Sequence, residues 1–204
     1  MKKSNVLNKH YWTKEAEEWR RLKPPERPSK EEIDIYEKNL QEILRYRGNE
    51  RIKAVIFGAT PELRDLLAKY KIFDVTLVDI NPNMVRAMQE LLKISKGREV
   101  VVIAGWLKTG LPSHKYDFIF CDHGTAHIRF KDWPKLFSEQ IRILKPDGFV
   151  VHNIVTRPEK EAISIKQYVD IYQKTRRHFT YADKFYYNYR CFMGLPNLQT
   201  KYFY

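Results

Sequence analysis

Three segments of the sequence carry residues whose types and spacing could do chemistry. The first is a glycine turn followed by a helix start, Gly58-Ala59-Thr60-Pro61-Glu62-Leu63. The second is an acid, Asp79, which stands twenty-one positions after the glycine. This spacing is typical of a nucleotide-binding strand-helix-strand unit, in which an acid accepts hydrogen bonds from ribose hydroxyls. The third, residues 121–127, contains an aspartate and two histidines, which are candidates for proton transfer.

The residues beside the glycine favour S-adenosylmethionine over a dinucleotide. A dinucleotide needs a second glycine so that the backbone can approach the pyrophosphate, and a carboxylate beside that anion is unfavourable. This chain has Thr60 and Glu62 there, and a ligand with a sulfonium and an ammonium group tolerates a nearby acid. Alternatively, Gly58 only ends a strand and Glu62 only complements a helix dipole. That alternative leaves the position of Asp79 unexplained.

The elements that must position these residues follow an alternation of short apolar runs and helical stretches, which is typical of a parallel sheet. The pattern predicts strands over residues 53–57, 75–78, 100–103, 118–121 and 149–154, and helices over 61–70, 82–94 and 133–144. A turn is expected at 145–148, and a last helix at 159–177. The aromatic tail, 179–204, is expected to form two more strands as a hairpin. The predicted fold class is α/β and Rossmann-like, with a mostly parallel seven-stranded sheet, a C-terminal antiparallel hairpin and helices on both faces.

A proline-rich segment, residues 24–28, separates two helices predicted at 13–22 and 29–46. The second should begin with Ser29 as its N-cap and Glu32 as the capping-box partner. We expect residues 1–46 to form a helical lid or extension and residues 47–204 to form the main domain, within one structural unit.

Together these residues resemble a family of class I S-adenosylmethionine-dependent methyltransferases with Gly-x-Thr-Pro-Glu-Leu in place of the usual glycine-rich motif. The resemblance covers most of the chain. Besides the glycine segment it rests on Trp19, the Pro24-Pro25-x-Arg-Pro-Ser string, Asp79-Ile80-Asn81-Pro82-Asn83-Met84 and Leu144-Lys145-Pro146-Asp147-Gly148. It implies the class I methyltransferase sheet and S-adenosylmethionine as the cofactor.

The resemblance also implies a set of cofactor-binding residues. Gly58, Ala59 and Thr60 are expected along the methionine part of the donor, Asp79 on the ribose and Met84 over the adenine. Where the family has Gly-Asp-Trp after the third strand, this chain has Ala104-Gly105-Trp106. Backbone groups of Gly105 and Trp106 could still bind the adenine edge, and the indole could stack on the base. The expected set is completed by Glu62, Ile80 and Asp122. We also expect Tyr11, Trp19 and Arg27 to be lid residues that fold over the donor site. Arg27 would lie either near the donor's carboxylate or at the sheet edge.

Asp122 and His123 follow the fourth predicted strand and are the candidates for a general base. Methyl transfer is an in-line displacement, so the enzyme must place the nucleophile and, for an oxygen or protonated nitrogen, remove a proton. Alternatively, Asp122 is a loop acid that binds backbone amides and His123 a polar lid residue. His123 and His127 have the spacing of a metal pair, but no third ligand is evident, and we expect no metal site.

Composition narrows the partners. The two cysteines are too few for a disulfide framework. Neither a signal core nor an apolar run long enough to span a membrane is present, so we expect a cytoplasmic protein.

The flanks, residues 1–30 and 155–204, carry +10 of the formal charge of +12. That charge favours anionic partners such as RNA or phosphorylated metabolites, or it is simply a lysine-rich surface. We expect a methyltransferase for a small or medium-sized acceptor. The alternatives are an RNA methyltransferase that uses the basic flanks and a non-catalytic nucleotide- or RNA-binding protein on the same fold.

Overall fold

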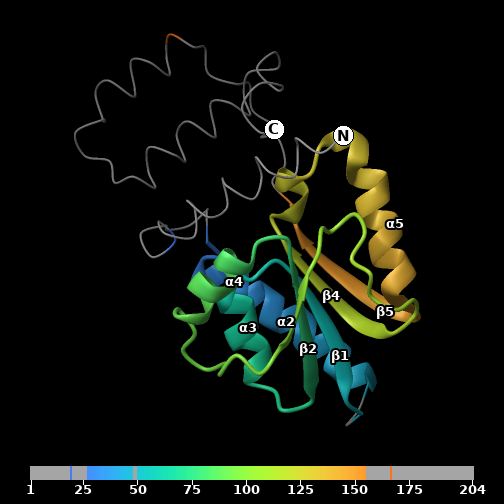
Figure 1. The fold of residues 1–204 in the computed structure, drawn as a ribbon. Helices are drawn as coiled ribbons and strands as arrows, with labels where there is room; N and C mark the ends of the chain where they lie inside the picture. The colour runs from blue at the N-terminus through green and yellow to red at the C-terminus, as the bar shows by residue number, and fades with distance from the viewer. Residues whose placement is uncertain (1–18, 20–26, 48–49, 155–165, 167–204) are drawn as a thin grey trace.

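A five-stranded parallel sheet is the centre of the computed structural model, which describes residue 19, residues 27–47, residues 50–154 and residue 166 (Figure 1). Its strands are β1 (Ile52–Phe57), β2 (Phe73–Asp79), β3 (Val100–Ile103), β4 (Tyr116–Asp122) and β5 (Leu144–Asn153). The strand order is β3-β2-β1-β4-β5, and every neighbouring pair is parallel. The chain runs outward from β1 to β3 and then crosses to the other side of β1. The carboxyl ends of β1 and β4 therefore border the switch point, where open α/β sheets bind ligands.

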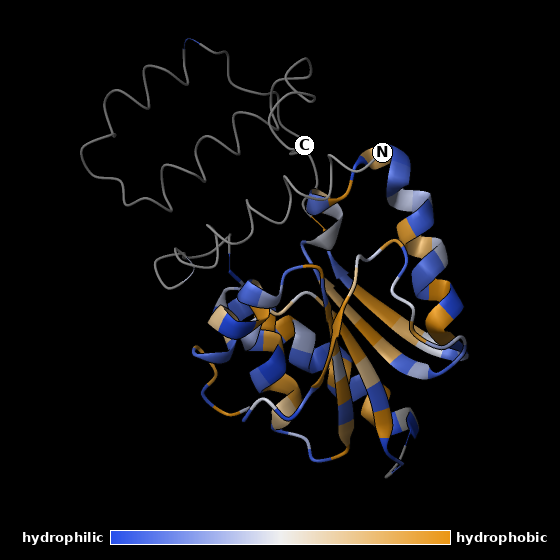
Figure 2. Ribbon diagram, in the orientation of Figure 1, coloured by the Kyte–Doolittle hydropathy of each residue, from blue (hydrophilic) through white to orange (hydrophobic). Residues whose placement is uncertain are grey.

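Helices cover both faces of this sheet (Figure 1). One face carries α2 (Lys30–Arg47), α3 (Pro61–Ala68) and α4 (Pro82–Gln89), and the other carries α5 (Trp133–Ile143). Two short 3-10 helices, η2 (Gly124–His127) and η3 (Phe130–Asp132), follow β4. Alternate residues of a strand point to opposite faces, and in β1 Ala54 and Ile56 enter the first core cluster while Val55 and Phe57 enter the second. Figure 2 shows the resulting apolar strands between helices with polar outer sides.

The start of α2 is the one predicted from the sequence. The Ser29 hydroxyl accepts a hydrogen bond from the Glu32 N–H at 3.1 Å, and the Glu32 carboxylate accepts one from the Ser29 N–H at 2.7 Å. This reciprocal capping box satisfies two backbone donors that the helix leaves without partners. Tyr36 and Leu40 then carry the buried face of the helix onto the sheet.

Two predicted boundaries are wrong. The helix expected at 82–94 ends at Gln89, because the Asp65 carboxylate accepts hydrogen bonds from the N–H groups of Lys93, Ile94 and Ser95 and so holds them outside a helix. The turn expected at 145–148 lies inside β5, where the pairing shifts between Tyr116↔Leu144 and Phe118↔Phe149. Opposite this irregularity, Asp117 binds the Lys145 ammonium at 2.7 Å and the Lys53 N–H at 3.0 Å.

Several predicted elements lie outside the described residues: the helices at 13–22 and 159–177, and the hairpin at 179–204. The described residues therefore give five strands of the expected seven. Within the described part, no helix combines the length and apolar character that crossing a membrane requires.

Candidate functional site

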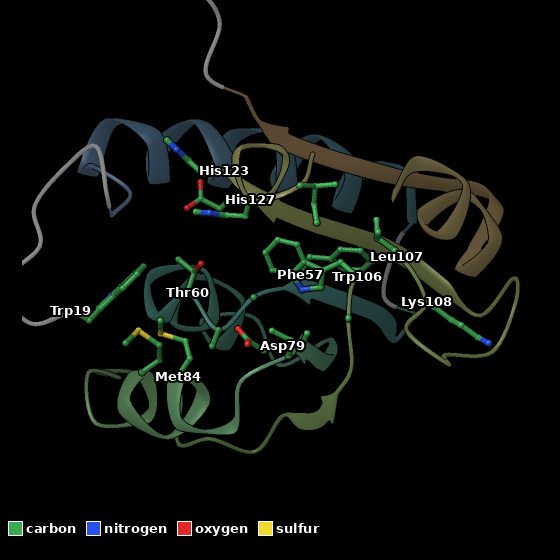
Figure 3. Close-up of a pocket in the computed structure, with 17 residues that line it drawn as sticks. Trp19, Phe57, Thr60, Asp79, Met84, Trp106, Leu107, Lys108, His123 and His127 are labelled. Carbon is green, nitrogen blue, oxygen red and sulfur yellow. The ribbon is translucent and has the colours of Figure 1, made fainter. Parts of the chain in front are cut away.

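A cavity of about 450 Å³ lies beyond the carboxyl ends of the strands. Its walls come from the residues that follow β1, β2, β3 and β4 (Figure 3). Most of the residues singled out in the sequence line it: Trp19, Gly58, Ala59, Thr60, Asp79, Ile80, Met84, Gly105, Trp106, Asp122 and His123. These residues come from separate parts of the chain, and the parallel sheet brings them to one edge. The cavity falls in the size range of ligand pockets, roughly 300 to 1,000 Å³.

The turn after β1 depends on glycine. Gly58 has φ +110°, which residues with a side chain rarely adopt, and its N–H donates to the Val78 carbonyl at 2.8 Å. Thr60 occupies the N-cap position of α3, but its hydroxyl makes no capping hydrogen bond. Pro61 stands at the first helical position, and because proline has no backbone N–H, the helix start has one donor fewer that needs a partner. Figure 3 shows Thr60 at the cavity wall.

Asp79 ends β2 and is nearly buried, with 8% of its surface exposed. Its Oδ1 accepts a hydrogen bond from the Asn81 N–H at 2.7 Å. Burial raises the pKa of this carboxyl to about 6, because the charged form loses water, and the hydrogen bond from Asn81 only partly offsets that effect. The Asn81 side chain caps α4 by accepting from the N–H groups of Asn83 and Met84.

Trp106 forms the wall of the cavity after β3. Its indole N–H donates to the Val78 carbonyl at 2.8 Å, which fixes the ring. The ring centroid lies 6.1 Å from that of Phe57, and a Cβ added at Gly58 would lie 3.6 Å from the indole. That distance is an ordinary contact, so the positive φ of Gly58, and not lack of space beside the ring, is what favours glycine here.

The carboxyl end of β4 presents Asp122 and His123 in different ways. Asp122 Oδ1 accepts hydrogen bonds from the Tyr36 hydroxyl at 2.8 Å and from the Asn153 side-chain amide at 3.1 Å. Burial raises the pKa of Asp122, and these two hydrogen bonds act in the opposite direction. His123 has φ +51°, and its Nε2 lies 3.8 Å from Glu32 Oε1 in α2. Figure 3 shows His123 extending toward α2, while His127 extends into the cavity.

Two of the expected site residues lie elsewhere, Arg27 and Glu62. Arg27 and Glu62 bond to each other, with 2.9 Å between Arg27 Nε and Glu62 Oε1. Both line a separate groove of about 300 Å³ rather than the main cavity. Tyr11 lies outside the described residues. In the part of the chain that the structure describes, no three His, Cys, Asp or Glu side chains are arranged to hold a metal ion.

The cavity also includes residues that the sequence did not single out as site residues: Phe57, Met88, Leu107, Lys108, His127 and Ile128. His127 had been considered only as a metal partner of His123. A histidine five positions after the end of β4 was the available signal, but the left-handed backbone at His123 and the 3-10 helix η2 decide how each imidazole is oriented at the cavity.

Comparisons with known proteins agree with this geometry. Residues 58–152 match a family model described as a methyltransferase domain, whereas no curated protein sequence shows significant similarity to the chain. Among solved structures, DhpI in a complex described as DhpI-SAM-HEP shares 18% identity over 78% of this chain and 70% of that one, with a TM-score of 0.55.

Two further structures share the fold. The PH0226 protein from Pyrococcus horikoshii OT3 has 22% identity over 66% of this chain and a TM-score of 0.51. A protein from Rhodobacter sphaeroides, named provisionally as a Zn-dependent alcohol dehydrogenase, has 17% identity over 81% of this chain and a TM-score of 0.54. The chain covers 64% and 63% of these two proteins, less than two thirds of either. Such identities establish a shared Rossmann-like fold. The methyltransferase-domain match over residues 58–152, with the cavity at its strand ends, supports S-adenosylmethionine as the cofactor.

Proposed function

We propose that the chain is an S-adenosylmethionine-dependent methyltransferase that acts on a small or medium-sized acceptor. The observation that carries this proposal is the meeting of Asp79 with the Gly58-Ala59-Thr60 turn in one cavity at the strand ends. A carboxylate at the end of β2 can accept hydrogen bonds from both ribose hydroxyls, and the glycine turn lies where the methionine part of the donor would run.

The remaining cavity residues fit the other parts of the donor. Ile80 and Met84 offer apolar contacts for the adenine, and Gly105 and Trp106 border the same region. The Trp19 indole nitrogen is buried without a hydrogen-bond partner among the described residues. A buried donor without a partner is costly, so the carboxylate of the donor would be a suitable acceptor for it. Arg27, held by Glu62, is a poorer candidate for that role.

The chemistry that bound S-adenosylmethionine supplies is an electrophilic methyl group on a cationic sulfur. The protein must hold the acceptor in line with it and take up any proton that the acceptor loses. Asp122 and His123 remain the candidates for the group that accepts this proton. The imidazole of His127 is a third candidate because it extends into the cavity (Figure 3).

Calorimetry of the full chain tests the proposal, with S-adenosylmethionine, NAD, an Asp79→Ala variant and an Asp74→Ala control. Asp74 lies on the same strand but is exposed and pairs with Arg51. We expect one equivalent of S-adenosylmethionine to bind and NAD not to bind. Loss of two hydrogen bonds to a charged group should weaken binding in Asp79→Ala by roughly 100-fold or more, while Asp74→Ala binds as the wild type does.

The outcomes separate the competing functions. Absence of S-adenosylmethionine binding would contradict the proposal and favour a non-catalytic binding protein. Binding of S-adenosylmethionine together with RNA affinity that falls steeply with salt would favour an RNA methyltransferase, because neutralised phosphates release counterions. The basic flanks that such an enzyme would use lie mostly outside the described residues.

A further inference from the structure

Two residues of α2 reach the carboxyl ends of β4 and β5. Glu32 and Tyr36 stand one helical turn apart and so lie on the same side of the helix. The Tyr36 hydroxyl donates to Asp122 Oδ1 at 2.8 Å. The Asn153 side-chain amide donates to Asp122 Oδ1 at 3.1 Å and to Glu32 Oε1 at 2.9 Å. The helix that precedes the sheet in sequence thus binds Asp122, a residue that lines the cavity.

This arrangement is more polar than packing alone requires. Tyr36 is 4% exposed and its ring packs edge-on against Phe120, with 5.6 Å between the centroids. A phenylalanine would make the same ring contact without a buried hydroxyl. Two carboxylates, an amide and a phenol in one partly buried cluster are costly to remove from water. A role in holding the Asp122 carboxylate would explain why these polar groups are present.

Both donors bind the same oxygen of Asp122. Hydrogen bonds from Tyr36 and Asn153 go to Oδ1, and the residue also lines the cavity. We propose that Tyr36 and Asn153 are positioning residues, which fix the Asp122 carboxylate with Oδ2 toward the cavity, beside the sulfonium of the bound methyl donor, as the proton acceptor of the reaction. This inference rests on the proposed function.

The step balances without any further reactant. The acceptor's nitrogen or oxygen forms a bond to the methyl carbon, the carbon–sulfur bond breaks with its electron pair going to sulfur, and the acceptor's proton moves to Asp122 Oδ2. The products are the methylated acceptor, S-adenosylhomocysteine and a protonated Asp122.

The charges around Asp122 suit this task. Burial raises its pKa, and the negative charge of Glu32 on α2 adds to that effect. His123 on the same segment and the hydrogen bonds from Tyr36 and Asn153 lower it. A carboxylate with a pKa above its usual range is a better base near neutral pH than an exposed one. The hydrogen bonds keep it ionised enough to accept the proton.

Carbon-13 NMR of the side-chain carboxyl groups in the full chain tests the inference. The Asp122 signal is titrated in the wild type, in Tyr36→Phe and in a control, Tyr70→Phe. The Tyr70 hydroxyl donates at 3.0 Å to Glu37, the next residue of α2, and not to Asp122. Loss of a hydrogen bond to the charged form should raise the pKa of Asp122 by roughly one unit in Tyr36→Phe. Tyr70→Phe should leave that pKa unchanged. Asn153→Ala should act in the same direction as Tyr36→Phe and serves if the latter does not fold.

The same titration with ligands locates the sulfonium. S-adenosylmethionine and S-adenosylhomocysteine differ by the charged methylsulfonium, so only the former should lower the pKa of Asp122. Tyr36→Phe with an unchanged Asp122 titration would overturn the positioning role. Equal effects of the two ligands would place Asp122 away from the sulfonium and overturn the inference, while their binding would leave the proposed function standing. If neither ligand binds, the proposed function fails and the inference falls with it.

Discussion

Arg27 and Glu62 form an ion pair at the first turn of α3, with 2.9 Å between Arg27 Nε and Glu62 Oε1. Their side chains are 22% and 21% exposed. The pair ties the segment before α2 to the helix that follows the glycine turn. Arg27 therefore has a partner within the protein, and Glu62 complements the helix start rather than facing the main cavity.

The first prediction follows from this pair. Arg27→Gln should lower the free energy of unfolding by about 1 kcal/mol, which is typical of a partly exposed ion pair, and should change the affinity for S-adenosylmethionine by less than about threefold. Urea denaturation and calorimetry measure the two effects. A tenfold loss of affinity with unchanged stability would instead place Arg27 on the donor's carboxylate.

The second prediction concerns pH. Because burial raises the pKa of Asp79 to about 6 in the free protein, the carboxylate that would bind the ribose is lost as the pH falls through that value. Affinity for S-adenosylmethionine should fall by about tenfold per pH unit below 6 until the pKa of the complex is reached. Asp79→Asn should bind weakly with a flat profile over the same range. A flat profile in the wild type would contradict the role of Asp79.

As the pH rises, ionisation of Asp79 should lower the stability of the free protein, although it raises the affinity for S-adenosylmethionine. The pKa of Asp79 in the folded state lies above its unfolded value of 3.8, so the folded protein holds more protons between these values. The contribution of Asp79 should therefore lower the stability of the free protein as pH rises from 3.8 to about 6. Comparing the wild type with Asp79→Asn by thermal denaturation across this window isolates that contribution.

Local patterns predicted the sheet and much of the cavity because their causes are local. Ser29 and Glu32 form the expected capping box, and Gly58 and Asp79 occupy strand ends that a parallel sheet brings to one edge. The partners of Asp122 could not be found in this way. Tyr36 and Asn153 are 86 and 31 positions away along the chain. The packing of α2 on the sheet brings Tyr36 to Asp122, and the register between β4 and β5 places Asn153 beside it.

The shortened α4 has a similar explanation. The residues after Gln89 look helical in isolation, but Asp65 in α3 binds three of their N–H groups, and propensity gives way to that tertiary contact. The orientation of His123 and His127 depends on one left-handed residue, which the spacing of histidines does not reveal.

The third prediction concerns a buried ion pair between α3 and the residue that precedes β3. The Arg64 side chain is fully buried, and its guanidinium binds Glu99 through contacts of 2.9 and 3.1 Å. Arg64→Leu should lower the free energy of unfolding by roughly 3 to 5 kcal/mol, because it leaves Glu99 buried without its partner. Arg64→Leu with Glu99→Leu should be more stable than Arg64→Leu alone. Urea denaturation of the four proteins of this cycle gives the coupling, and additive effects would show that the two side chains do not act as a pair.

The fourth prediction concerns the left-handed backbone at the cavity wall. His123 has φ +51° and His114 has φ +52°, and this conformation costs a residue with a side chain about 1 to 2 kcal/mol. The His123 Nε2 atom is also buried without a hydrogen-bond partner among the described residues, whereas His114 Nδ1 lies 3.1 Å from the Leu144 carbonyl. His123→Gly should therefore raise the free energy of unfolding by about 0.5 to 1 kcal/mol, and His114→Gly should raise it less because it also loses a hydrogen bond.

Strained residues that persist at a cavity often serve function. His123→Gly should therefore gain stability and lose methyl transfer to any acceptor identified, measured as product formed per enzyme. A His123→Gly protein that is less stable than the wild type would show that the imidazole contributes more to packing than its backbone costs.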